Sequence, residues 1–126
     1  MKIVIVAILI LQQLFASHIS WLGNYDKALV LAKKENKPLM VVVIKSKSTQ
    51  SKNIIKNLTF NNQIAKKFIC VIVNFDIQDY PIELFYTTVF PTIFLINPKN
   101  EQFIKEPLYY PISANEISKS LLEENK

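Results

Sequence analysis

Residues 37–60 read KPLMVVVIKSKSTQSKNIIKNLTF, and this stretch decides the fold. Leu39 to Ile44 is a continuous apolar run rich in β-branched residues, which is typical of a central strand covered on both faces in an α/β sheet. After the loop Lys45-Ser46-Lys47, Ser48 or Thr49 can cap a helix that runs toward Phe60 with Ile54, Ile55 and Leu58 on its apolar face. The stretch therefore predicts a buried strand, a short loop and a helix start.

The flanking sequence alternates between helices and strands. Upstream, Tyr25 to Asn36 has helical apolar spacing with Asn24 as N-cap, and Lys37-Pro38 ends that helix because proline lacks an amide proton. Downstream we predict further elements in this order: a short helix capped by Asn61 or Asn62 and running through Ala65, a buried strand Ile69 to Phe75, a turn Asp76 to Pro81, a short helix Ile82 to Thr88, strands Thr92 to Asn97 and Glu101 to Lys105 joined as an antiparallel hairpin, and a last helix opened by a Ser113/Glu116 capping box. This order indicates an α/β domain.

Composition limits the function classes. The chain has 126 residues, of which half are hydrophobic and only one is glycine, so it predicts one domain with loops that turn largely without glycine. All fifteen basic residues are lysine, against ten acidic residues, and aromatic residues do not interleave with them. Nucleic-acid surfaces usually use the bidentate guanidinium of arginine, so we expect no nucleic-acid partner and interpret the lysine pairs as solvated helix faces.

The first seventeen residues have the layout of a signal peptide. Met1-Lys2 gives a basic start, Ile3 to Leu11 is apolar, and small residues follow at Ala16-Ser17, where we expect cleavage. The apolar run is too short to cross a bilayer, which takes about twenty residues, so a cleaved signal is favoured over a membrane anchor. We therefore expect export to a periplasm, a secretory lumen or the extracellular space, with no stable membrane span after cleavage.

The chain has one cysteine, Cys70, which lies within the apolar run Phe68 to Val73. Free cysteine is among the most buried residue types, and no His, Arg or helix start lies nearby in the sequence to lower the pKa of Cys70. We interpret Cys70 as a core residue, with a reactive thiol as the alternative.

Several residues, in order and spacing, resemble the thioredoxin superfamily, and the likeness is strongest to exported thioredoxin-like domains. The matching positions are Trp21, Tyr25, Ala28, the segment AKKENKP at 32–38, Lys52, Phe60 and Phe90-Pro91-Thr92. The resemblance implies an α/β thioredoxin-like fold over residues 18–126, with residues 1–17 as the signal. It implies a central mixed sheet of four strands, with room for an extra edge strand, flanked by helices.

In that family a Cys-x-x-Cys pair opens the helix after the first central strand, where the helix N-terminus stabilises a thiolate. The resemblance places Ser48 and Ser51 at the two cysteine positions, so Ser48, Thr49, Gln50 and Ser51 form a degenerate active site. A serine hydroxyl forms no disulfide and a helix start cannot make it a useful alkoxide. The sole histidine, His18, borders the signal peptide, so we assign no catalytic residue, metal or cofactor and expect that the protein is not an enzyme.

The resemblance also implies a cis bond between Phe90 and Pro91, with the backbone before the proline pairing with extended peptides. An ordinary trans proline leading an edge strand is the alternative. Our leading hypothesis is an exported, redox-inactive thioredoxin-fold protein that binds a protein or extended peptide at the surface around Ser48 to Ser51, Phe90 and Pro91. The alternatives are a thiol-disulfide enzyme that uses Cys70, and a structural subunit that docks through Tyr80, Tyr86, Tyr109 and Tyr110.

Overall fold

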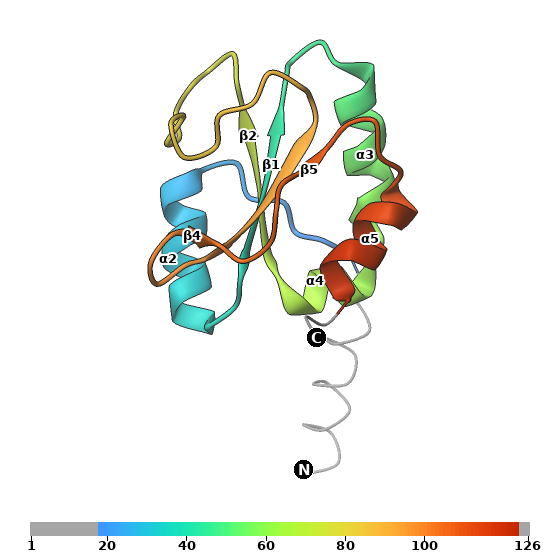
Figure 1. The fold of residues 1–126 in the computed structure, drawn as a ribbon. Coiled ribbons are helices and arrows are strands. Elements are labelled where there is room, and N and C mark those ends of the chain that lie inside the picture. The colour runs from blue at the N-terminus through green and yellow to red at the C-terminus, as the bar shows by residue number, and fades with distance from the viewer. Residues whose placement is uncertain (1–17, 124–126) are drawn as a thin grey trace, which may run out of the picture.

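The computed structural model describes residues 18–123, and the predicted signal peptide at 1–17 lies outside the described residues. A five-stranded sheet forms the centre, and its strands are β1 (Leu39–Ile44), β2 (Ile69–Asn74), β3 (Thr92–Asn97), β4 (Gln102–Phe103) and β5 (Leu108–Tyr109). The helices are α2 (Tyr25–Glu35), α3 (Thr49–Thr59), α4 (Asn62–Lys67) and α5 (Ala114–Leu122) (Figure 1).

The strands form a mixed sheet in the order β2-β1-β3-β4, and β5 pairs with β3 as well. β1 is parallel to β2 and antiparallel to β3, with Ile44 opposite Asn74 and Val43 opposite Thr92. The carboxyl ends of β1 and β2 and the start of β3 therefore meet at one edge of the sheet.

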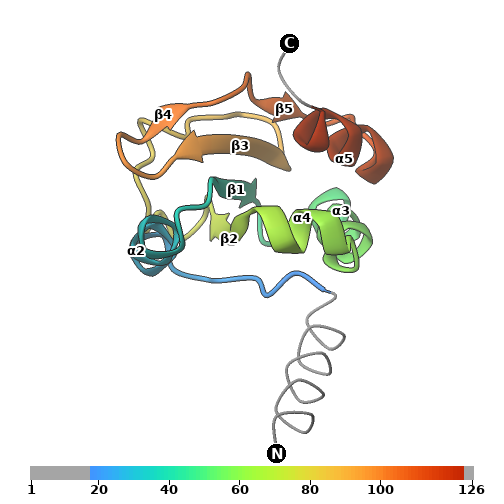
Figure 2. The same cartoon turned by 90° about the horizontal axis from the view of Figure 1, so that it is seen from below.

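β1 is buried on both faces, as its apolar run predicts. Leu39, Val41 and Val43 point to a core covered by α2, whereas Met40 and Val42 point to a second core covered by α3, α4 and α5. All five side chains have an exposed fraction of 0 %. Figure 2 shows α2 on one side of the strands and the other three helices on the opposite side.

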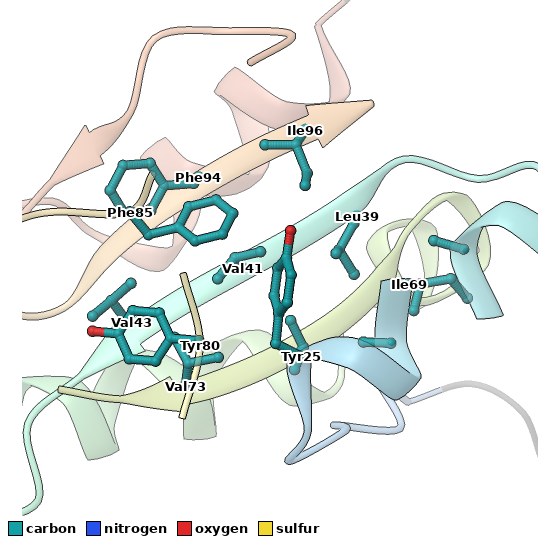
Figure 3. Packing of buried hydrophobic residues seen from close by; sticks show 13 residues of the cluster. Tyr25, Leu39, Val41, Val43, Ile69, Val73, Tyr80, Phe85, Phe94 and Ile96 are labelled. Carbon is teal, nitrogen blue, oxygen red and sulfur yellow. The ribbon is translucent and has the colours of Figure 1, made fainter. Parts of the chain in front are cut away.

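Aromatic rings fill the first core. Phe85 lies 5.4 Å from Tyr25 and 5.2 Å from Phe94 between ring centroids, both in edge-to-face arrangements (Figure 3). The Tyr25 hydroxyl donates to Glu101 Oε1 over 2.8 Å, and burial is the main cause of its raised pKa. These contacts connect α2 with β3 and with the segments that precede and follow β3.

Side-chain caps begin the helices as the sequence predicts. Asn24, Ser48, Asn61 and Ser113 each accept a hydrogen bond from an amide of the first turn. α2 ends at Asn36, which adopts the left-handed conformation with φ 55°, so the turn toward β1 is made by an asparagine where glycine is the usual choice.

Two predicted elements differ in the structure. Residues 82–88, expected to be a helix, form a turn that has only one helix-type bond, from Phe85 N to Pro81 O. β-branched residues at 87–89 disfavour continuation, and burial of Phe85 fixes the turn instead. The strand expected at 101–105 has only two paired residues, because after Ile104 N bonds to Leu95 O the chain turns away from β3 until β5.

The first described residues are built into the fold. Ile19 N donates to Thr59 O, Trp21 Nε1 donates to Thr59 Oγ1 over 3.0 Å, and Leu22 forms a parallel bridge with Val71. Ile19 is buried in the second core. Within residues 18–123, no helix has the length and apolar character needed to cross a membrane.

Candidate functional site

The candidate site lies at the edge where β1 and β2 end and β3 begins. The loop after β1 is fixed to the end of β2, because Ser46 N donates to Asp76 Oδ2 over 2.9 Å and Asn74 Nδ2 donates to Ser46 Oγ over 2.7 Å. The hydrogen bond from the Ser46 amide is the main cause that lowers the pKa of the Asp76 carboxyl. These bonds fix the loop that leads directly into α3.

Ser48 is the N-cap of α3. Its Oγ accepts a hydrogen bond from Ser51 N over 3.1 Å and lies 3.2 Å from Gln50 Oε1, to which it donates. Thr49 and Gln50 are exposed on the first turn, and that turn has no acidic residue. The residue types at the four predicted positions thus provide a capped, uncharged helix start.

Ser51 differs from Ser48 in burial. Its exposed fraction is 0 %, and its Oγ has no hydrogen-bond partner among residues 18–123. A buried hydroxyl without a partner is costly, by about 1–3 kcal/mol. Ser51 therefore lies behind Ser48 and cannot present its hydroxyl to a ligand at the surface.

Phe90 and Pro91 lie beside the end of β1, because Thr92 pairs with Val43. The bond between them is cis, as the resemblance implies. Lys45 Nζ lies 5.6 Å from the Phe90 ring centroid and 6.0 Å from that of Phe75, and the two rings are 5.2 Å apart. The lysine and the two rings join the ends of β1 and β2 to the loop before β3.

A hydroxyl pair holds the loop before Pro91. Thr87 Oγ1 and Thr92 Oγ1 are 2.9 Å apart, and Thr92 Oγ1 donates to Val89 O over 2.6 Å. Pro91 O accepts from Tyr110 N over 3.2 Å. By contrast, the amide and carbonyl of Phe90 have no hydrogen-bond partner within the part of the chain that the structure describes. The amide and carbonyl of Phe90 are therefore free to form hydrogen bonds with a ligand backbone.

A hollow of about 420 Å³ adjoins the helix start and is lined by Lys45, Ser46, Lys47, Ser48 and Asp76. Of these residues, only Ser48 is predicted from the sequence to be a site residue. Asp76 follows β2 as Lys45 follows β1, and the carboxyl ends of adjacent parallel strands share one edge, so this spacing was the signal that could have found them.

Other candidate residues lie away from the site. Cys70 is buried on β2, and burial raises the pKa of its thiol to about 12. Tyr80, proposed above as a docking residue, is instead buried in the first core, whereas Tyr86, Tyr109 and Tyr110 are exposed. Among residues 18–123, no group of three or more His, Cys, Asp or Glu side chains could hold a metal ion.

Comparisons with known proteins identify the architecture. No protein-family model matches the chain, and a sequence comparison with characterised proteins finds no match. Among solved structures, Trxlp from Edwardsiella tarda has 22% identity and a TM-score of 0.68, over 82% of this chain and 100% of that one.

Two further structures agree with the first. A thioredoxin from Thermus thermophilus has 18% identity and a TM-score of 0.63, over 82% of this chain and 84% of that one. The DsbH oxidoreductase has 18% identity and a TM-score of 0.61, over 81% of each chain. At these identities the likeness establishes the fold alone, and the chain has a thioredoxin-like fold.

Proposed function

We propose that this protein is exported and binds an extended peptide or an unfolded segment of a partner protein, without redox chemistry. The binding surface comprises the helix start at Ser48, Thr49 and Gln50 and the loop at Phe90 and Pro91, with Ser51 packed behind it. The observation that carries the proposal is the unpaired backbone of Phe90 beside a fixed, partly apolar surface.

Strand pairing supplies the affinity in this proposal. An extended peptide can exchange two backbone hydrogen bonds with the amide and carbonyl of Phe90, in the manner of an added strand. The surrounding groups are held before binding, because Lys45 lies over the rings of Phe75 and Phe90 and the Thr87/Thr92 pair holds the loop. A preorganised surface loses less entropy when a ligand binds.

The chemistry of the site opposes a thiol-disulfide activity. The helix start has serine at the two positions that the resemblance aligns with cysteines, and a hydroxyl cannot form a mixed disulfide. Cys70 is 3 % exposed and its thiol is protonated at neutral pH. Binding is therefore favoured over the enzyme that uses Cys70.

The test is NMR mapping of amide shifts with a reduced, carboxymethylated protein that stays unfolded as the probe. We expect shift changes at the amides of residues 45–51 and 86–90, since Pro91 has no amide proton. A synthetic peptide with a segment of the probe's sequence should shift the same amide signals. The same peptide N-methylated at the residue that pairs with Phe90 should bind at least tenfold more weakly, because it lacks the N–H donor.

Two phenylalanines provide a matched pair of variants. Phe90→Ala should weaken peptide binding at least tenfold, whereas Phe60→Ala, which removes a ring that is 78 % exposed at the other end of α3, should leave it unchanged. Shift changes confined to other surfaces, or equal binding by the N-methylated copy, contradict the proposal.

Export has its own measurement. Intact mass of the protein recovered from outside the cytoplasm should correspond to a chain that begins at Ser17 or His18, because cleavage is expected after Ala16 or Ser17. Recovery of the full-length chain from the cytoplasm alone contradicts export, and it leaves the peptide-binding proposal untouched.

A further inference from the structure

A basic surface lies at the end of the sheet opposite the candidate site. Three adjoining hollows of about 230, 190 and 200 Å³ surround Lys37 and Pro38, where β1 begins. We call this surface the basal face and define it by the four lysines that line the hollows, which are Lys37, Lys67, Lys99 and Lys105.

Separate elements contribute these charges. Lys67 is in the last turn of α4, Lys99 is in the turn between β3 and β4, and Lys37 precedes β1. The last turns of α2 and α4 add Lys33, Lys34 and Lys66 at the same end of the molecule (Figure 1).

Two carboxylates, Glu35 and Glu123, line the same hollows, so lysines outnumber acids there. Lys105 Nζ donates to the carbonyl oxygens of Ser120 and Glu123 and is held by α5. Ile104, which is 38 % exposed, gives the basal face an apolar group between Lys99 and Lys105. The basal face thus combines positive charge with one exposed apolar side chain.

The amino-terminal segment joins the fold at this face. His18 lines the same hollow as Lys37, and Ile19 is fixed by its bond to Thr59 O, so no spacer separates residue 17 from the folded domain. The seventeen preceding residues include the apolar run Ile3 to Leu11. Before the expected cleavage, a membrane that holds that run is separated from the basal face by at most the reach of residues 12–17, roughly 20 Å.

We propose that the basal face binds the anionic headgroups of a phospholipid bilayer. Lysines near an anionic leaflet are attracted over about a Debye length, roughly 8 Å at physiological ionic strength, and before cleavage the junction at His18 presents the basal face toward that leaflet. The absence of arginine disfavours nucleic acid as the polyanion. In this orientation the peptide site at the other end of the sheet points away from the membrane.

The experiment is flotation of the full chain with vesicles of phosphatidylglycerol and phosphatidylcholine in equal parts, beside vesicles of phosphatidylcholine alone. We expect a partition coefficient at least tenfold higher for the anionic vesicles, and a loss of that preference at high salt. Both measurements use the unmodified protein, so they do not depend on the folding of a variant.

Two charge-matched triple variants locate the contact. Lys66→Gln, Lys67→Gln and Lys99→Gln together should reduce anionic-vesicle binding about tenfold or more. The control variant, Lys27→Gln, Lys47→Gln and Lys52→Gln, changes three exposed lysines near the other end of the sheet and should reduce binding less than about threefold. Thermal unfolding of both variants verifies that each is folded.

Three results overturn the proposal. The first is equal binding to both vesicle types, which assigns binding to the apolar run alone. The second is an equal loss in the two triple variants, which assigns it to net charge and not to the basal face. The third is an affinity for duplex RNA, measured in the same buffer, that matches or exceeds the affinity for anionic vesicles. A failure here leaves the proposed peptide site intact, because that site shares no residue with the basal face.

Discussion

Ser48 and Ser51, three residues apart, have opposite effects on stability. Ser51→Ala removes a buried hydroxyl that has no partner among the described residues, so we expect the free energy of unfolding to rise by about 1 kcal/mol. Ser48→Ala removes the N-cap of α3 and should lower the free energy of unfolding by about 1 kcal/mol. Urea unfolding of the three proteins, with equal slopes, measures both changes.

The pair is its own control, since both substitutions delete one hydroxyl from the same helix. A larger loss of stability for Ser51→Ala than for Ser48→Ala would mean that the Ser51 hydroxyl has a partner in solution.

Cys70 makes stability depend on pH. Burial raises the pKa of its thiol from 9.0 to about 12, so above about pH 9 the unfolded chain loses a proton that the folded chain retains. The stabilisation is complete below the unfolded pKa and is lost as pH rises toward 12, at up to about 1.4 kcal/mol per pH unit. We therefore expect the stability advantage of the natural chain over Cys70→Ala to shrink steadily above about pH 9.

Denaturant unfolding at a series of pH values gives that difference directly. All other ionisable groups are the same in both proteins and cancel, and the cavity left by alanine adds an offset that does not change with pH. A difference that stays constant between pH 8 and pH 11 contradicts the buried, protonated thiol.

The loop before β3 depends on a buried pair of hydroxyls. Thr92→Val keeps the shape of the side chain but removes the hydrogen bond to Val89 O, so we expect a loss of about 1–2 kcal/mol in the free energy of unfolding. Weaker peptide binding should accompany it, because the loop holds Phe90. The matched control is Thr88→Val, whose side chain is exposed and should change stability by less than about 0.5 kcal/mol. Equal effects of the two substitutions would count against this anchor.

Elements determined by local sequence were predictable. The apolar run of β1 and the capping residues Asn24, Ser48 and Ser113 act within a few residues of themselves, and the structure confirms them. Residues 82–88 were mispredicted because the burial of Phe85 against Tyr25 and Phe94, from distant elements, determines their conformation. The short pairing of β4 likewise depends on where the chain leaves β3, and the spacing of apolar residues does not indicate that point.

The candidate site was predictable in part for the same reason. Local sequence predicted the capped helix start, and the resemblance located the Phe90-Pro91 turn. Neither predicted the contacts between Lys45, Phe75 and Phe90, which join three separate segments. The difference in burial between Ser48 and Ser51 also could not be predicted from the sequence, because it depends on how α3 packs on the second core. What a residue contacts across the sheet is a property of the fold, and the linear pattern contains only its secondary structure.

The molecule as a whole has two different ends. One end carries the capped start of α3, the ring pair and the unpaired backbone of Phe90, and the other carries the basal face and the junction with residues 1–17. In the sequence the lysines are short pairs and single residues, which we interpreted as solvated helix faces. The parallel pairing of β1 and β2 places the ends of α2 and α4 together, so their common location follows only from the topology.

The measurement that tests the central claim most directly is a disulfide-exchange assay on three proteins: the natural chain, Cys70→Ser, and the double variant Ser48→Cys with Ser51→Cys. The double variant places a thiol at the N-cap of α3 and a second at its third residue, the placement that favours a nucleophilic thiolate. We predict no turnover by the natural chain or by Cys70→Ser, and measurable turnover by the double variant. Turnover by the natural chain that disappears in Cys70→Ser would contradict a binding protein without redox chemistry.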